Sequence, residues 1–316
     1  MFIDRLIDNI KSKNNPTVVG LDPRIEYVPT FLKEEAFNKY GKNIKGAAEA
    51  IYEFNKRIID AVWDLVPALK LQVAYYEMYG VPGMDVLGRT IKYGKEKGLL
   101  IICDGKRNDI GSTAEAYSSA FLGQTRIDEE TCESVFDADA LTVNPFLGYD
   151  GIKPFIDDCK NYGKGIFILV KTSNKSSGQF QDLLTVQGKS IYEVMAEYVS
   201  EWGKGLVGNY GYSNVGAVVG ATYPNQAKIL RSLMKQAYIL VPGYGAQGGT
   251  AKDVVHSFNC DNLGAIVNAS RSIMCAYKSE TWKDKYNEEE FDMASREEVI
   301  RMKNDINNEL GVRVCQ

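Results

Sequence analysis

The sequence predicts a single (β/α)8 barrel (TIM barrel) that takes up residues 1–316 as one domain. Eight short apolar segments alternate with amphipathic segments, which is typical of parallel strands covered by helices on both faces. Polar side chains gather where the apolar segments end, as they do at the mouth of a barrel. A doubly wound open sheet is the alternative, but no GxGxxG turn follows the first strand. These strand-end residues are Asp22, Lys70, Asp104, Lys106, Ser173, Gln247 and Arg271.

The N-terminal half begins with a helix and contains four of the predicted strands. Apolar residues from Phe2 to Ile10 recur at helical spacing, and Pro16 ends that helix. Short apolar runs predict strands at 17–21, 68–73, 99–103 and 140–144. Longer segments with a helical period predict helices at 47–65, 75–97 (with a possible turn at 80–83) and 113–121. Residues 25–46 are polar and mixed, so we expect a loop with a short helix there.

The C-terminal half continues this alternation. Apolar runs predict strands at 165–171, 215–220, 238–241 and 263–268. Helices are predicted at 151–159, 191–202 and 226–235. The segment 174–187 is rich in Ser, Gln and Gly, so we expect a mobile loop there. A charged tail at 279–316 has a helical pattern.

Composition and charge argue against several classes of protein. Hydrophobic residues make up 45% of the chain and charged residues 25%, as in ordinary globular proteins. A net charge of -4 argues against a nucleic-acid-binding protein. No stretch approaches the roughly twenty apolar residues that cross a bilayer, and the N-terminus lacks the apolar core of a signal peptide. The six cysteines lack CxxC spacing, which favours a cytoplasmic protein over a disulfide framework or a zinc site.

The strongest indication of chemistry is the stretch 101–113, where a buried strand runs into charged residues. Asp104 and Lys106 lie on the same side if the backbone stays extended, and Asp109 follows after a turn. Lys70 lies inside another apolar strand and needs a partner to keep its charge, which Asp104 on the neighbouring strand can supply. We therefore expect these four residues to form an alternating array of charges. Because such an array is costly to desolvate, it favours catalysis over a structural ion pair.

A second candidate site combines a glycine-rich loop with an arginine. Gly243, Gly245, Gly248 and Gly249 follow the seventh strand, and Arg271 follows the eighth. In barrels, these two strand ends often bind phosphate through backbone N–H groups, and an arginine can add two hydrogen bonds. The alternative is a set of tight loops with a surface arginine. The glycines alone are weak evidence, and Arg271 on the next strand end strengthens the prediction of a phosphate site.

The remaining residues narrow the reaction type. His256 is the only histidine in the sequence and is expected on an outer helix, so histidine acid–base catalysis is not expected. The sequence contains neither a GxSxG nor an HExxH motif. A barrel mouth that holds two lysines, several carboxylates and a phosphate site suits a small phosphorylated anion that reacts through a carbanion.

The run Asp104-Gly105-Lys106-Arg107-Asn108-Asp109-Ile110-Gly111 resembles the DxKxxDIG signature of the orotidine 5'-phosphate decarboxylase family. The likeness spans roughly residues 17–275. The length of the chain and its Asn144-Pro145 loop are similar to the longer, type 2-like branch of bacteria and protozoa. The DxKxxD pattern is highly specific in this setting.

The other candidate residues resemble the family in the same order along the chain. Asp22 resembles the ribose-binding aspartate, and Lys70 the lysine of the second strand. Ser173 is the loosest match and resembles the serine that contacts the pyrimidine. The run 242–249 is similar to the phosphate loop, with Gln247 as its closing glutamine and Gly248 beside it, and Arg271 resembles the phosphate arginine.

The resemblance implies decarboxylation of orotidine 5'-monophosphate (OMP) to uridine 5'-monophosphate (UMP), without a cofactor or a metal. It implies that Lys106 stabilises and protonates a carbanion at carbon 6 of the pyrimidine. It also implies that Asp109 and Thr113 reach into the active site of a partner subunit. A homodimer with shared sites, acting in pyrimidine synthesis, is therefore expected.

Three other functions remain open. Metal-dependent sugar-phosphate decarboxylases and aldolases of the same superfamily share DxKxxD, but at the position of Lys70 they have a glutamate that binds magnesium with two aspartates. The positive charge of Lys70 would repel a divalent ion between Asp22 and Asp104. A Schiff-base aldolase is less favoured, because flanking carboxylates keep a lysine protonated and poorly nucleophilic. A nucleotide-binding barrel without catalytic activity is the third alternative.

Overall fold

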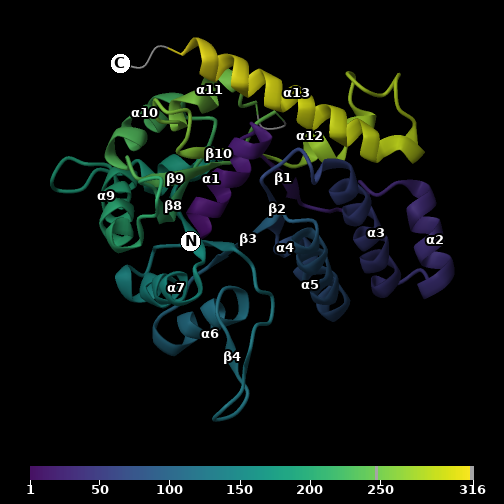
Figure 1. Ribbon diagram of the computed structural model, residues 1–316, viewed down its shortest axis with the longest axis horizontal. Helices are drawn as coiled ribbons and strands as arrows, with labels where there is room; N and C mark the ends of the chain where they lie inside the picture. Colours follow the sequence, from purple (N-terminus) through teal and green to yellow (C-terminus); the bar gives the residue numbers. More distant parts are fainter. Residues whose placement is uncertain (246–247, 314–316) are drawn as a thin grey trace.

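The computed structural model describes residues 1–245 and 248–313. Eight parallel strands close into a barrel in the order β1-β10-β9-β8-β7-β6-β3-β2, with helices around the outside (Figure 1). This arrangement confirms the predicted (β/α)8 barrel. The barrel strands are β1 (Thr17–Leu21), β2 (Ala68–Gln72), β3 (Leu100–Arg107), β6 (Ala140–Val143), β7 (Gly165–Lys171), β8 (Ser213–Val219), β9 (Ala237–Val241) and β10 (Ala265–Ala269).

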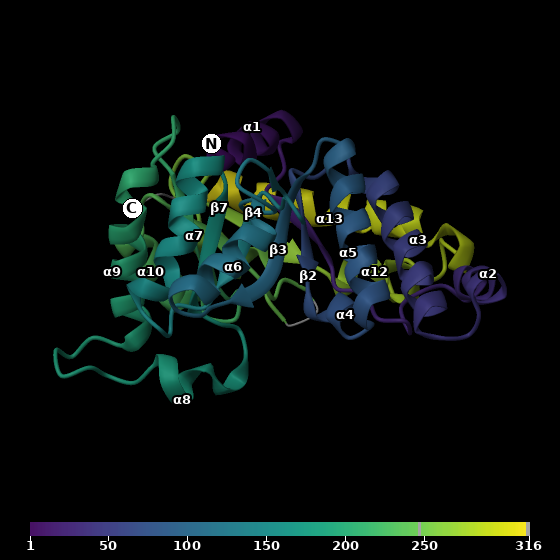
Figure 2. The same ribbon diagram turned by 90° about the horizontal axis from the view of Figure 1, so that it is seen from below.

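The helices largely follow the strands one by one, and four of them are single turns. Figure 2 shows α1 at one end of the barrel and α8 at the other. The helices are α1 (Phe2–Lys13), α2 (Thr30–Tyr40), α3 (Ile44–Val62), α4 (Ala74–Glu77), α5 (Gly80–Glu96), α6 (Gly111–Phe121), α7 (Tyr149–Tyr162), α8 (Gly178–Gln181), α9 (Ile191–Gly203), α10 (Pro224–Leu233), α11 (Ala251–Val254), α12 (Arg271–Met274) and α13 (Phe291–Val312).

The core has two layers, as expected for strands that are buried on both faces. Outside the barrel, one face of each strand packs against the surrounding helices. Inside it, side chains such as Val18, Ile102 and Leu240 pack against α1, which closes the N-terminal end of the barrel. The ring of Phe2 in α1 meets the ring of Phe167 edge-on, with 6.1 Å between the ring centres. The C-terminal end of the barrel is therefore the end at which a ligand site can lie.

The segment predicted as a helix at 75–97 with a possible turn at 80–83 forms α4 and α5, which are separated near Gly80, where φ is +61°. The break thus lies at the start of the predicted turn. One further part of the fold was not expected from the sequence. A small hairpin of β4 (Thr125–Arg126) and β5 (Cys132–Glu133) lies between α6 and β6. Each of its strands has two residues, which is too short to show a period of two in the sequence.

The C-terminal segment packs against the first part of the barrel. Residues 279–287 form turns rather than a helix, and α13 begins at Phe291 after a short 3₁₀ turn. The ring of Phe291 packs against that of Phe54 in α3, with 5.0 Å between their centres. Across the described part of the chain, no helix combines the length and the apolar character needed to cross a bilayer.

Candidate active site

A cavity of about 740 Å³ opens at the C-terminal end of the barrel. Charged and polar side chains from several strand ends line it, together with a few apolar ones such as Leu169 and Leu240. Its position matches the mouth at which the active site of a (β/α)8 barrel lies. The predicted site residues that line the cavity are Asp22, Lys70, Asp104, Lys106, Ser173 and Arg271.

Asp104 lies at the centre of a cluster of charges on this cavity. Its Oδ2 accepts a hydrogen bond from Lys70 Nζ at 3.0 Å, and its Oδ1 accepts one from Lys106 Nζ at 2.6 Å. Lys70 Nζ also lies 3.3 Å from Asp22 Oδ1. The two lysines differ in access, because the side chain of Lys70 is 3% exposed and that of Lys106 is 44% exposed. Lys106 can therefore meet a ligand, whereas Lys70 is enclosed by its carboxylates.

The cluster keeps its charges despite burial. Burial opposes ionisation of Asp104, but the nearby ammonium groups of Lys70 and Lys106 outweigh it and hold the pKa of the carboxyl well below its usual range. Burial likewise favours a neutral Lys70, but Asp104 and Asp22 outweigh it and raise the pKa of its ammonium above the usual range. Asp104 and Lys70 are thus both charged at neutral pH.

Two uncharged residues complete the surroundings of Asp104, and neither is among the site residues predicted from the sequence. Gln72 Nε2 donates to Asp104 Oδ2 at 2.9 Å, and Thr142 Oγ1 donates to Asp104 Oδ1 at 2.8 Å. Thr142 Oγ1 also accepts a hydrogen bond from the backbone N–H of Lys106 at 3.0 Å. A signal was present for Gln72, since it lies two residues after Lys70 on β2 and thus on the same side of the strand. Thr142, in the middle of an apolar run, gave no comparable signal.

Asp104 and Lys106 were expected on the same side of a regular, extended strand. The backbone between them is instead irregular. The pairing of β3 with β6 shifts register between Cys103 and Arg107, and Lys106 has a φ of +47°. This conformation costs a non-glycine residue about 1–2 kcal/mol. It nevertheless leaves the Lys106 ammonium within hydrogen-bonding distance of Asp104. Strained backbone of this kind is often found at functional sites.

The predicted four-residue array is incomplete within one chain. Asp109 Oδ1 accepts a hydrogen bond from the neighbouring backbone N–H of Ile110 at 2.8 Å. Within the described residues, no ion pair joins Asp109 to Lys70 or Lys106. Thr113 is exposed on α6, and neither Thr113 nor Asp109 lines the cavity. One chain therefore brings together Lys70, Asp104 and Lys106 and leaves Asp109, which is partly buried, and exposed Thr113 outside the cavity.

The glycine-rich loop after β9 borders the cavity next to Arg271. Gly243 lines the cavity and has a φ of +98°, a conformation that favours glycine. The N–H of Gly249 donates to the Gly243 carbonyl at 3.1 Å, so these two glycines lie close together. Gly248 is exposed and is not part of the cavity wall. Gln247 lies outside the described residues.

The remaining candidates for acid–base or metal chemistry lie elsewhere. His256 is in a 3₁₀ turn after α11, partly buried and outside the cavity wall formed by the described residues. Across residues 1–245 and 248–313, no group of three or more His, Cys, Asp or Glu side chains is arranged to hold a metal ion. The ammonium of Lys70 lies between Asp22 and Asp104, where it occupies the carboxylates that a cation would need.

Comparison with known proteins adds independent evidence. The family described as "Orotidine 5'-phosphate decarboxylase / HUMPS family" matches residues 17–284. The orotidine 5'-phosphate decarboxylase of Caldicellulosiruptor saccharolyticus is 47% identical over 283 residues, which cover 90% of this chain and 92% of that protein. The protein of the same name from Rhodopirellula baltica is 44% identical over 301 residues, covering 95% of this chain and 97% of that protein.

A solved structure agrees with the sequence matches. OMP decarboxylase of Leishmania donovani is similar to this structure with a TM-score of 0.73 at 28% identity. The match covers 98% of this chain and 99% of that one. Fold, cavity and sequence matches lead to the same conclusion. The chain belongs to the orotidine 5'-phosphate decarboxylase family.

Proposed function

We propose that this protein converts OMP to UMP in the cytoplasmic synthesis of pyrimidines, without a metal or an organic cofactor. Membership of the family supports the reaction. One observation of the site carries the proposal: Lys106 lines the cavity with an accessible ammonium, and its partner Asp104 is buried beside it with its negative charge intact. A proton donor and a fixed negative charge side by side suit the loss of a carboxylate as carbon dioxide.

In this mechanism, the bond from carbon 6 to the carboxylate breaks and its electron pair stays on carbon 6. Lys106 stabilises the carbanion and donates a proton to it, and solvent then reprotonates the amine. Asp104 faces the substrate carboxylate, and two unit charges about 4 Å apart repel by about 4 kcal/mol at an effective dielectric of about 20. Enzymes lower barriers by roughly 8–23 kcal/mol. The larger share therefore falls to Lys106.

The other residues of the site bind and orient the nucleotide. Lys70 holds Asp104 and Asp22 in place, and Asp22 binds the ribose. Ser173 contacts the pyrimidine. Arg271, which lines the cavity, binds the phosphate together with Gly248 and Gln247 from the loop after β9. Because the phosphate is remote from the bond that breaks, its binding energy can hold the substrate and the surrounding loops in the reactive arrangement.

The proposal includes a homodimer with shared active sites. Asp109 is partly exposed just before α6, and Thr113 is exposed in the first turn of α6. A second copy would receive both residues at its own cavity, where Asp109 would complete the array begun by Lys70, Asp104 and Lys106. This account explains why a carboxylate so close in sequence to Lys106 contacts neither lysine within one chain.

A reaction in heavy water tests the proposed chemistry. If a solvent-exchanged Lys106 ammonium protonates carbon 6, OMP incubated with the protein in heavy water yields UMP with one deuterium at carbon 6. Mass spectrometry and proton NMR of the purified UMP measure the incorporation. UMP that carries hydrogen at carbon 6 under these conditions would contradict protonation by an exchangeable group.

Arg271→Ala tests the phosphate site. The substitution removes a charged hydrogen-bond donor, and losing two such bonds of about 1.5 kcal/mol each raises the KM for OMP by roughly a hundredfold. Turnover of orotidine, which lacks the phosphate, stays the same in parent and variant. Steady-state kinetics with both substrates measure the difference, with Arg89→Ala on α5 as the control outside the cavity. An equal loss on OMP and on orotidine would rule out the phosphate assignment.

A further inference from the structure

Strand β7 ends in a lysine that the proposed mechanism does not use. Leu169 lines the cavity, so a regular strand would also turn Lys171 toward the cavity, two residues later. The pairing of β7 with β8 shifts register between Leu169 and Lys171, as at a β-bulge. Lys171 is 0% exposed and lies outside the cavity wall that the described residues form. The bulge thus places a buried ammonium beneath the segment that follows β7.

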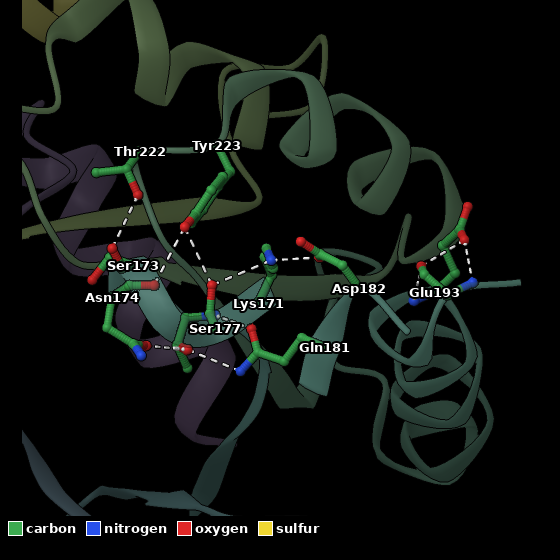
Figure 3. Close-up of polar contacts among 11 residues, drawn as sticks. Lys171, Ser173, Asn174, Ser177, Gln181, Asp182, Glu193, Thr222 and Tyr223 are labelled. Carbon is green, nitrogen blue, oxygen red and sulfur yellow. Dashed lines mark hydrogen bonds and ion pairs between the residues drawn. The ribbon is translucent and has the colours of Figure 1, made fainter. Parts of the chain in front are cut away.

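The Lys171 ammonium lies between two chain segments (Figure 3). Its Nζ is 2.6 Å from Asp182 Oδ1 and 3.3 Å from Ser177 Oγ, both in the segment after β7. On its other side, Nζ lies 4.5 Å from the ring centre of Tyr223, which follows β8. One buried charge therefore ties the residues after β7 to those after β8.

Both segments support the backbone at Ser173 and Asn174, which line the cavity. Thr222 Oγ1 donates to the Ser173 carbonyl at 3.3 Å, and Tyr223 OH donates to the Asn174 carbonyl at 3.3 Å (Figure 3). Ser177 Oγ donates to Tyr223 OH at 3.2 Å. A continuous chain of hydrogen bonds therefore runs from the Lys171 ammonium through Ser177 and Tyr223 to the edge of the cavity.

The fit around Ser173 leaves little freedom. A Cβ atom on Gly220 would lie 2.8 Å from the Ser173 Cα, so the absence of a side chain at Gly220 allows this close approach. On the other side, Gln181 accepts a hydrogen bond from the Thr172 N–H at 3.0 Å and donates to Thr172 Oγ1 at 2.9 Å. A shift of residues 177–182 would therefore be passed on to Ser173.

Stability alone is a weak reason for a buried lysine here, because apolar residues of the same size often stabilise a fold equally well. Lys164 provides a comparison. It is also buried, directly precedes β7 and pairs with Asp137, but it lies at the opposite end of the strand from the cavity. A buried lysine thus pairs with a partly exposed aspartate at each end of β7, and only the Lys171 pair lies next to the candidate site.

We propose that Lys171 is a positioning residue: by holding Asp182, Ser177 and Tyr223, it fixes Ser173 and Asn174 at the pyrimidine end of the cavity. The inference rests on the proposed function, in which Ser173 contacts the pyrimidine. Lys171 itself does not touch the substrate. Its removal therefore acts through Ser173, and this dependence separates positioning from a general effect on stability.

A double-mutant cycle between Lys171 and Ser173 tests the inference. Lys171→Met lowers kcat/KM for OMP by roughly tenfold to a hundredfold, since small displacements of a contacting group have effects of this size. Lys171→Arg, which keeps the charge, retains most of the activity. In a Ser173→Ala background, Lys171→Met causes little further loss, because the group that it positions is already gone. Additive losses in the double variant would overturn the proposal, as would an unchanged kcat/KM in Lys171→Met.

Two controls keep the outcome interpretable. Lys164→Met lowers the midpoint of thermal unfolding and leaves kcat/KM within about twofold of the parent, since its ion pair is remote from the cavity. If Lys171→Met does not fold, Asp182→Asn removes the other half of the pair and gives the same cycle with Ser173→Ala. UMP affinity is measured by calorimetry in every variant. It gives the same double-mutant cycle between Lys171 and Ser173 from binding alone, without catalysis. A parent that binds UMP but does not decarboxylate OMP would contradict the proposed function, while the coupling in UMP affinity would still decide the role of Lys171.

Discussion

Lys106→Ala abolishes measurable decarboxylation and leaves UMP binding detectable. The substitution removes both the charge that stabilises the carbanion and the proton that completes the reaction, and each of these contributions is worth about a hundredfold or more. We therefore expect kcat to fall by at least about ten-thousandfold. Binding survives because Lys70 still neutralises Asp104 and the phosphate site is untouched. Single-turnover kinetics measure the loss, and calorimetry with UMP measures the affinity.

The matched control for this variant is Lys153→Ala. Lys153 also pairs with an aspartate, Asp157, but on the exposed face of α7. This variant keeps the kcat of the parent, because its ion pair is solvated and distant from the cavity. Normal turnover by folded Lys106→Ala would exclude Lys106 as the proton donor.

A mixture of two inactive variants regains activity. Lys106→Ala and Asp109→Ala subunits each lack one residue of the shared site, so a mixed dimer contains one site with both defects and one intact site. After dissociation and random reassociation at equal amounts, half of the dimers are mixed, and activity returns to about a quarter of the parent value. Activity is measured before and after reassociation, and differently tagged subunits verify that mixed dimers have formed.

The control is a mixture in which no intact site can form. Lys106→Ala subunits combined with Lys106→Ala/Asp109→Ala subunits give mixed dimers that lack Lys106 at every site, so they stay inactive. Substitution of Glu115, an exposed carboxylate on α6, leaves activity unchanged in the homodimer. Verified mixed dimers of the first pair without any recovery would show that Asp109 does not serve the partner's site.

Much of the fold is predictable from the sequence because barrel strands are buried on both faces. Such strands are continuous apolar runs, and the predicted bounds of β1 at 17–21 and β7 at 165–171 are those of the structure. Secondary structure was hardest to predict in helices that bury few side chains. In α2, only Leu32 and Ala36 are buried, which leaves almost no apolar period to detect.

In the candidate site, the contacts of the charged residues could be predicted from the sequence, whereas those of the uncharged residues could not. The ion pairs that link Lys70 and Lys106 to Asp104 follow from three charges within or at the end of buried strands, where unpaired charges are costly. Gln72 and Thr142 are uncharged, and their hydrogen bonds to Asp104 depend on strand register, which the sequence does not reveal.

Bulges set a second limit on prediction. Alternation along regular strands would place Lys171 in the cavity and Lys106 on the same side as Asp104. In the structure, a register shift buries Lys171 outside the barrel, and another gives Lys106 a positive φ. Asp109 raises a different problem, because a single chain does not show contacts with a second subunit. Within this chain, its Oδ1 accepts a hydrogen bond from the N–H of Ile110.

The central claim, metal-independent decarboxylation of OMP, is tested most directly by the ultraviolet absorbance of OMP in the presence of the purified protein. The assay is run with and without EDTA, after the protein has been shown to be folded and dimeric. The account predicts that the orotidine signal is lost at the same rate in both samples as UMP forms. No loss of signal would contradict decarboxylation and favour a nucleotide-binding barrel. Activity that EDTA removes and magnesium restores would favour the metal-dependent relatives instead.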